Sequence, residues 1–234
     1  MVRRPPPWAL VKELGARGQM RRLALAAPRL QRAPRGDGGP VLLVAGFGST
    51  APSLLPLQTW LRSLGHDAHT AELGAVGRDL PAEVSALCEQ AAERADSSGR
   101  GLALVGWSLG GVVAREAARE SGVLIRRVVT FGAPTMGGPA AMALAAFYGE
   151  ARLAEIESWL DARRHDPILV PLTTIWSARD GVVADEARHD ELTPSADHVE
   201  VHSAHVAMAL DPDVWLVIAD RLASDGRAID SYVG

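Results

Sequence analysis

Short apolar runs alternate with amphipathic stretches along most of this chain. Runs typical of buried strands lie at Val41–Ala45, His69–Leu73, Leu102–Gly106, Arg126–Phe131, Leu172–Trp176 and Val199–His202. Stretches with helical spacing lie at Leu54–Leu64, 79–95, Leu109 to about Glu120, and from Asp211 onward. Strands that alternate with helices need right-handed crossovers, which place helices on both faces of a mostly parallel sheet. The sequence therefore predicts the α/β fold class, and with 47% of its 234 residues apolar the chain can bury a sizeable core.

The composition argues against several classes of protein. The net charge of −4 disfavours a nucleic-acid partner. Cys88 is the only cysteine, so neither a disulfide framework nor a cysteine metal cluster is expected. Pro5, Pro6 and Pro7 stand where a secretory signal would have its apolar stretch, and no run is long enough to span a bilayer. We therefore expect a cytoplasmic protein.

Residues 1–38 form a basic leader that differs from the rest of the chain. The leader holds nine Arg or Lys residues against Glu13 and Asp37, a net charge of +7, which leaves −11 for the main domain, residues 39–234. Its apolar residues recur loosely at helical spacing: Leu10, Leu14, Met20, Leu23, Leu25 and Leu30. Two interpretations stay open: a helix docked on the acidic main domain, and a basic amphipathic helix in peripheral contact with a membrane.

About forty residues between Phe131 and Leu172 interrupt the alternation, because they have helical character but no strand pattern. Their apolar residues are Met136, Met142, Leu144, Phe147, Tyr148, Leu153, Ile156, Trp159 and Leu160. An insertion of this size is usually functional, although an ordinary connecting helix pair is the alternative. We predict a small helical lid at about residues 135–168, with Met136, Phe147 and Trp159 in contact with substrate.

The stretch LALVGWSLGG, residues 102–111, places Ser108 at the end of a predicted buried strand and at the start of a predicted helix. A buried hydroxyl without a partner costs free energy, so this serine serves a turn or a reaction. Gly106 and Gly110 remove side chains that would collide with the adjacent strand and helix. The pattern G-x-S-x-G in this setting is typical of a nucleophile elbow, a strained turn that exposes a reactive serine at the sheet edge.

With this context, the chain resembles the α/β-hydrolase family, and in particular its small lipase- and esterase-like members, over about residues 39–225. The resemblance implies Ser108 as nucleophile, with the Leu109 N–H as one oxyanion donor. The stretch LLVAGFGST resembles the family's glycine-rich loop, so the Phe47 N–H would be the second donor, preceded by Gly46. We place Gly46 and Trp107 among the substrate-binding residues. Ala45 and Thr135 stand where the family often has histidines.

The same resemblance implies the chain order serine, acid, histidine for a catalytic triad. Asp180 follows the predicted strand Leu172–Trp176 in the stretch SARDGVV, whereas Asp185 and Asp190 are interpreted as surface charge. The stretch VEVHSAHVAMALDPDVW resembles the family's terminal segment, in which the base lies between the last strand and the last helix. We favour His205 as the base, with His202 as the alternative.

These residues predict a serine hydrolase that cleaves carboxylic esters with short to medium acyl groups through an acyl-enzyme on Ser108. The chemistry needs no metal and no organic cofactor. One alternative is an acyltransferase or thioesterase that uses the same triad, and another is a non-catalytic, hydrolase-like binding protein. The expected partner is a small-molecule or lipid ester, and the oligomeric state stays open.

Overall fold

Six parallel strands form one sheet in the computed structural model, which describes residues 4–16, 18–121 and 124–223. The strands are β1 (Pro40–Val44), β2 (Asp67–Thr70), β3 (Leu102–Trp107), β4 (Ile125–Phe131), β5 (Leu172–Trp176) and β6 (Asp197–Glu200), in the spatial order β2-β1-β3-β4-β5-β6. The predicted fold class is confirmed. The two edge strands begin two residues earlier than predicted, because the half-exposed β2 and the exposed β6 lack a continuous apolar pattern.

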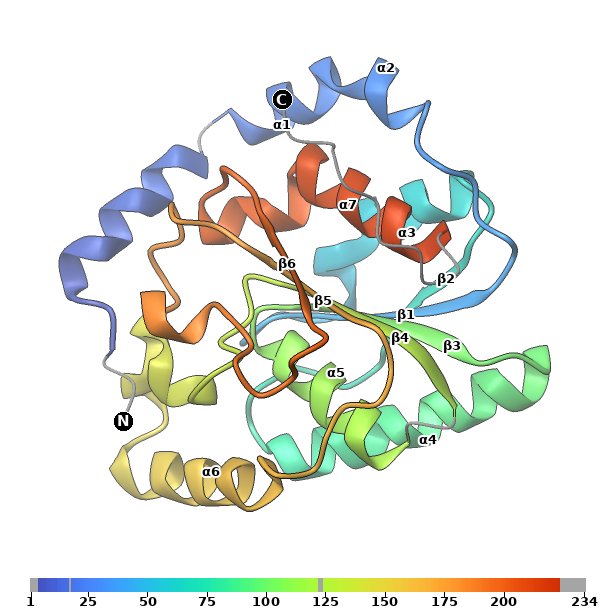
Figure 1. Cartoon of the computed structure of the whole chain (residues 1–234). Coiled ribbons are helices and arrows are strands. Elements are labelled where there is room, and N and C mark those ends of the chain that lie inside the picture. Colours follow the sequence, from blue (N-terminus) through green and yellow to red (C-terminus); the bar gives the residue numbers. More distant parts are fainter. Residues whose placement is uncertain (1–3, 17, 122–123, 224–234) are drawn as a thin grey trace.

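Helices cover both faces of the sheet (Figure 1). On one face lie α3 (Leu55–Ser63), which follows η2 (Ala51–Leu54), and α7 (Pro212–Ala223). On the other lie α4 (Leu80–Ser98) and α5 (Leu109–Glu120). Asp79 caps α4 by accepting the Ala82 N–H, and Gly99 ends the helix in the left-handed conformation. Because both faces are covered, the central strands β1, β3 and β4 are buried almost throughout.

Glycines let the start of α5 approach the strands more closely than any side chain would permit. A Cβ atom built on Gly110 would lie 2.2 Å from the Ala45 carbonyl oxygen. One built on Gly106 would lie 2.5 Å from the Gly110 carbonyl oxygen. Both distances are shorter than van der Waals contact, so the predicted role of these glycines in strand–helix packing is confirmed.

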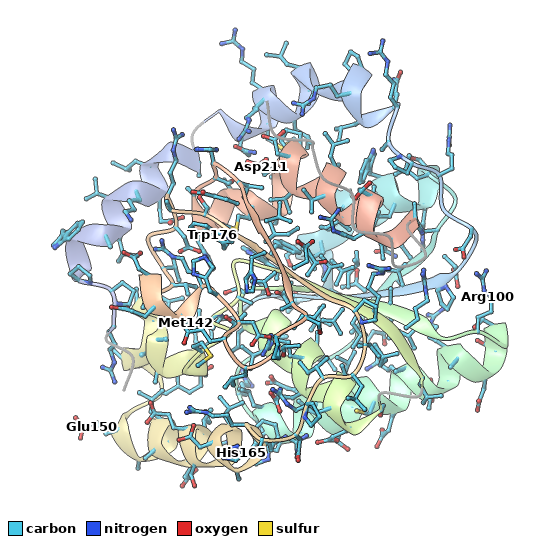
Figure 2. All side chains as sticks on the ribbon, in the orientation of Figure 1. Arg100, Met142, Glu150, His165, Trp176 and Asp211 are labelled. Carbon is cyan, nitrogen blue, oxygen red and sulfur yellow. The ribbon has the colours of Figure 1, made fainter. Side chains whose placement is uncertain are left out.

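The segment between β4 and β5 is helical, as expected, and hydrogen bonds and ion pairs attach it to the loop after β5 and to α5, among other places. It contains η3 (Gly138–Ala141), η4 (Ala143–Phe147) and α6 (Glu150–Arg163). The Ala143 N–H donates to the Val182 carbonyl oxygen at 2.8 Å, and Arg163 on α6 pairs with Glu116 of α5 at 2.9 Å. Figure 2 shows Met142 inside the molecule and Glu150 at its edge.

The leader docks on the main domain through polar groups and through a few apolar side chains. It contains η1 (Pro7–Ala16), α1 (Gln19–Leu25) and α2 (Ala27–Leu30), and α1 and α2 run along the outside of α7 (Figure 1). Arg22 pairs with Asp211 at 2.6 Å, and the Gln19 amide donates to the Leu210 carbonyl oxygen at 3.2 Å. Leu30 is buried, but four members of the predicted stripe are exposed: Leu10, Leu14, Met20 and Leu25. The leader thus turns most of its large apolar side chains outward.

One acidic residue is not where the sequence analysis placed it. Asp190, interpreted as surface charge, is buried and pairs with the buried Arg115 of α5 at 2.5 Å. Burial alone would raise the pKa of Asp190. The Arg115 guanidinium and the hydrogen bonds that the Asp190 carboxylate accepts outweigh burial and lower this pKa. The carboxylate therefore ties the segment after β5 to α5, an interaction between distant residues that no local pattern reveals. Asp185 is exposed, as expected.

Within the residues the structure describes, no helix is both long and apolar enough to cross a membrane.

Candidate active site

Ser108 occupies the sharp turn between β3 and α5. Its φ of 54° and ψ of −125° make it the single non-glycine residue with positive φ in the described part of the chain. The turn is held by the Ser108 N–H, which donates to the Phe131 carbonyl oxygen at 2.9 Å, and by the Gly111 N–H, which donates to the Ser108 carbonyl oxygen at 2.9 Å. Strain of this kind persists only where the surrounding structure enforces it, and it is commonest at functional sites.

The structure brings the three predicted triad side chains into one hydrogen-bonded chain. His205 begins η6 (His205–Leu210), and its Nε2 lies 2.9 Å from the Ser108 Oγ. Its Nδ1 lies 2.7 Å from the Asp180 Oδ2. All three side chains are buried, whereas the side chain of His202, the alternative base, is exposed. The geometry therefore selects His205 from the two histidines considered.

Asp180 is held as a carboxylate. Its second oxygen, Oδ1, accepts the N–H groups of Val182 at 2.7 Å and Val183 at 2.9 Å. Burial pushes the pKa of Asp180 upward, but His205 and these two backbone donors outweigh burial and lower it. A carboxylate at this position accepts a hydrogen bond from the His205 Nδ1–H, which leaves the Nε2 as an acceptor for the Ser108 hydroxyl.

The acid loop, Ser177–Ala184, and the base loop, Val201–Val206, are joined to each other. The Ser177 hydroxyl oxygen accepts the N–H of Ser203 at 3.2 Å. Arg188, which follows η5 (Asp185–Ala187), donates to the Asp180 carbonyl oxygen at 2.7 Å and to the Val183 carbonyl oxygen at 2.9 Å. The sequence analysis missed Arg188, because an arginine eight residues after the acid carries no local signal.

Two leader residues that the sequence analysis did not assign to the site also reach these loops. The Lys12 ammonium donates to the Ala178 carbonyl oxygen at 3.1 Å. The Glu13 carboxylate accepts backbone N–H groups from both loops. One signal could have drawn attention to Glu13: it is one of two acids among the nine basic residues of the leader.

The predicted oxyanion donors lie on the two segments that border the nucleophile. A Cβ atom on Gly46 would be 3.2 Å from the Ser108 Cβ, so the loop after β1 reaches the serine directly. Phe47 follows in the same loop, which is closed by the Ser49 N–H donating to the Gly46 carbonyl oxygen at 3.0 Å. Leu109 is the first residue of α5, so its N–H has no partner inside the helix.

The four predicted substrate-contact side chains lie in different surroundings. The exposed Phe147 ring is 6.3 Å from the Phe47 ring, and the Trp107 ring is 6.1 Å from the His205 ring. Met136 packs instead on a small cluster with Ala141, Val183, Ala184 and Ala187. Trp159 lies under the Arg163 guanidinium, 4.7 Å from it, on the part of α6 that pairs with α5. Phe147 and Trp107 thus border predicted site residues, whereas Trp159 borders the α5 contact.

Among the described residues, no group of three or more His, Cys, Asp or Glu side chains could hold a metal ion.

No protein-family model and no curated protein matches this sequence. Solved structures match its fold at low identity. MGS-MChE2, an α/β-hydrolase enzyme from a sediment metagenome of the lagoon of Mar Chica, Morocco, is 20% identical and covers 80% of this chain and 91% of its own, with a TM-score of 0.57. The monoacylglycerol lipase of Paleococcus ferrophilus is 15% identical over 82% of this chain and 96% of its own, with a TM-score of 0.61. The thioesterase domain from the curacin biosynthetic pathway is 13% identical, and the match covers 82% of this chain and 93% of that domain, with a TM-score of 0.60.

These matches and the parallel sheet show that the chain has the α/β-hydrolase fold.

The lowered pKa of Asp180 predicts how stability depends on pH. Because the folded-state pKa lies below the unfolded-state value, the carboxylate stabilises the protein above the unfolded-state pKa, and this contribution is lost as pH falls through the folded-state pKa. We expect the free energy of unfolding of the wild type to exceed that of Asp180→Asn most near neutral pH, with the margin shrinking below about pH 4. Urea unfolding across this range measures it.

The exposed Asp96 on α4 provides the control, because Asp96→Asn should change stability little at any pH. A margin between wild type and Asp180→Asn that stays constant with pH would contradict the ionised, stabilised carboxylate.

Proposed function

We propose that this protein is a serine hydrolase that cleaves carboxylic esters through an acyl-enzyme on Ser108. The observation that carries the proposal is the hydrogen-bonded chain of Ser108, His205 and Asp180 at a strained strand-to-helix turn. A serine hydroxyl is a weak nucleophile unless a base removes its proton and a third group orients that base. The contacts described above supply both requirements.

The reaction follows from this geometry in two halves. His205 Nε2 takes the Ser108 proton as the Ser108 Oγ attacks the ester carbonyl carbon, and the resulting oxyanion accepts the N–H groups of Phe47 and Leu109. The intermediate collapses, the alcohol leaves with the proton from His205, and an acyl-enzyme remains. Water then attacks the acyl-enzyme with His205 again as base, which releases the acid and restores Ser108. Each oxyanion donor contributes about 3–4 kcal/mol of transition-state stabilisation in comparable sites.

Two alternatives differ in what the triad does. An acyltransferase or thioesterase would use the same acyl-enzyme with another acceptor or leaving group, and a thioesterase domain is among the structures that share the fold. A non-catalytic binding protein would need no strained serine and no oriented base, so the observed hydrogen bonds favour an enzyme. Competition by added alcohols or amines for the acyl group separates a transferase from a hydrolase.

Replacement of the triad residues tests the proposed function. Ser108→Ala should lower kcat for a p-nitrophenyl ester by several powers of ten, to the residual rate that the oxyanion donors alone supply, while the protein stays folded. Asp180→Asn and His205→Ala should each cost a comparable factor, because tautomer control or the base is lost. A fluorophosphonate probe should label the wild type at Ser108.

The exposed His202 gives a matched control, since His202→Ala should retain the wild-type rate. Near-wild-type turnover by a folded Ser108→Ala protein would end the proposal.

The insertion supplies an apolar wall beside the proposed oxyanion loop. The Phe47 ring contacts both Tyr148, at 5.4 Å between centroids, and Phe147. Met142, Leu153 and Ile156 are buried in the core, so they anchor the insertion and leave the rings near Phe47 to meet substrate. Because the insertion is small, we infer that it accommodates short to medium acyl groups. We therefore propose esters of such acids as the substrate class.

Phe147→Ala tests the proposed acyl-chain pocket. The variant should raise KM for an octanoate ester more than for an acetate ester, because only the longer chain reaches the apolar wall. A series of p-nitrophenyl esters measures this. Trp159→Ala serves as the comparison, because Trp159 contacts Arg163 on the side of α6 that faces α5. If this variant also raised KM for the octanoate ester more than for the acetate ester, the proposed pocket would extend to α6. Equal effects of Phe147→Ala on both esters would contradict the substrate class.

The outer face of the leader supports peripheral membrane contact. Six of the ten large apolar side chains that are exposed in the described residues belong to the leader: Trp8, Leu10, Val11, Leu14, Met20 and Leu25. Exposed arginines accompany them, including Arg4, Arg21 and Arg32. Apolar and basic side chains on one segment match the acyl boundary and the anionic headgroups of a lipid surface. We propose that the leader both docks on the main domain and contacts membranes.

Vesicle binding tests the membrane contact. The full-length protein should bind vesicles that contain phosphatidylserine, and added salt should weaken the binding because it screens the arginines. The triple substitution of Trp8, Val11 and Leu14 by serine should abolish binding in a folded protein, because these side chains are exposed and their loss leaves the core intact. Leu55→Ser, at an exposed position on α3, is the control. No vesicle binding by the intact protein would end the membrane proposal.

A further inference from the structure

One carboxylate of the leader accepts hydrogen bonds from both loops that carry the triad. The Glu13 Oε1 accepts the Gly181 N–H at 2.8 Å and the His205 N–H at 3.2 Å. The Glu13 Oε2 accepts the Val206 N–H at 2.9 Å. Gly181 directly follows Asp180, and His205 is the proposed base itself. Glu13 therefore bridges the backbone next to the acid and the backbone of the base.

The neighbours of Glu13 hold η1 against the same loops. Lys12 donates to the Ala178 carbonyl oxygen at 3.1 Å, on the other side of Asp180 from Gly181. A Cβ atom on Gly181 would lie 2.3 Å from the Ala9 carbonyl oxygen, so η1 packs on the acid loop as closely as a glycine permits. Ala9 is itself buried by this contact. The fit between η1 and the acid loop is thus specific in shape as well as in hydrogen bonding.

The triad depends on the relative position of these two loops. Asp180 and His205 are 25 residues apart in the chain and must keep a separation of 2.7 Å between Oδ2 and Nδ1. β6, the strand that leads to the base loop, is the edge strand of the sheet and is largely exposed, so it supports that loop from one side. The Ser177–Ser203 hydrogen bond is one cross-link between the loops, and Glu13 adds a second from outside the main domain.

We propose that Glu13 is a positioning residue of the active site, which holds the acid loop and the base loop in register from the leader. This inference rests on the proposed function, because it assigns Glu13 a purpose in the reaction of Ser108. Carboxylate acceptors form stronger hydrogen bonds with backbone N–H groups than neutral acceptors do. A displacement of about 1 Å between reacting groups can reduce the rate by about 10²-fold. Glu13 thus acts on kcat through the placement of His205 and makes no contact with substrate.

Two substitutions of Glu13 and one control elsewhere in the leader test this role. Glu13→Ala removes all three acceptor contacts. Glu13→Gln keeps one carbonyl oxygen for Gly181 and His205 but turns an NH₂ group toward the Val206 N–H, so it should show an intermediate effect. The control is Arg22→Met, which removes the ion pairs of the leader with Asp211 and Asp213 but none of the hydrogen bonds that the leader makes with either loop.

Three measurements on the full-length proteins separate positioning from simple stability. We expect Glu13→Ala to lower kcat and the rate of fluorophosphonate labelling at Ser108 by about ten- to a hundredfold, with KM within about twofold of wild type. Hydrogen exchange should accelerate in both the acid loop and the base loop. Arg22→Met should lower the melting temperature but keep kcat and the labelling rate near wild type.

The outcomes are distinct. If the wild type is labelled at Ser108 and both Glu13 variants match Arg22→Met in kcat, labelling and loop exchange, the positioning role is wrong and the proposed function survives. If the wild type itself is neither active nor labelled, the proposed function fails. Hydrogen exchange then still decides whether Glu13 holds the two loops together, because that measurement needs no activity. Should Glu13→Ala fail to fold, Glu13→Gln carries the same comparison.

Discussion

The close approach of α5 to β1 and β3 is the constraint on which the rest of the site depends. Gly106 and Gly110 permit it, because a Cβ atom at either position would overlap backbone oxygens. The approach forces the chain through a sharp turn at Ser108. Its φ of 54° is sustained by the hydrogen bond that its N–H donates to Phe131 and by the one that its carbonyl oxygen accepts from Gly111. Packing thus determines a strained backbone, and the strained backbone presents the hydroxyl to His205. The same packing brings the loop after β1, with its proposed oxyanion donor, against the serine.

The three proposed triad residues follow strands that lie progressively nearer the edge of the sheet. Ser108 directly follows the buried central strand β3, whereas the proposed acid and base follow β5 and the exposed edge strand β6. Contacts outside the sheet hold the acid loop and the base loop. Arg188 donates to the Asp180 carbonyl oxygen, the Ser177 hydroxyl oxygen accepts the Ser203 N–H, and Glu13 of the leader accepts the Val206 N–H. Buried polar groups that are fully satisfied rigidify their surroundings. On the role proposed for Glu13, the leader is part of the framework of the proposed site.

The leader presents two different surfaces. Its inner side uses Gln19, Arg22 and Glu13 for polar contacts and packs small residues and Leu30 against the main domain, while six of its large apolar side chains are exposed. This arrangement reverses the usual amphipathic pattern, in which the apolar stripe faces the core. A lipid surface that contacts the outer side would act on a segment whose inner side accepts the backbone N–H groups of Gly181 and His205.

Local periodicity and motifs at strand ends were enough to predict the α/β fold class, most strand positions, and Ser108, Asp180 and His205 as the triad candidates. The edge strand β6 was misplaced by two residues because its exposed residues carry no apolar pattern. No local pattern revealed that Asp190 is buried with Arg115, that four of the six members of the leader's apolar stripe are exposed, or that Glu13 reaches Gly181 and His205. The contacts of Asp190 and Glu13 join residues at least 75 positions apart, and the exposure of the leader depends on which face of a helix packs. A local sequence pattern contains neither kind of information, because both arise only when distant parts of the chain come together.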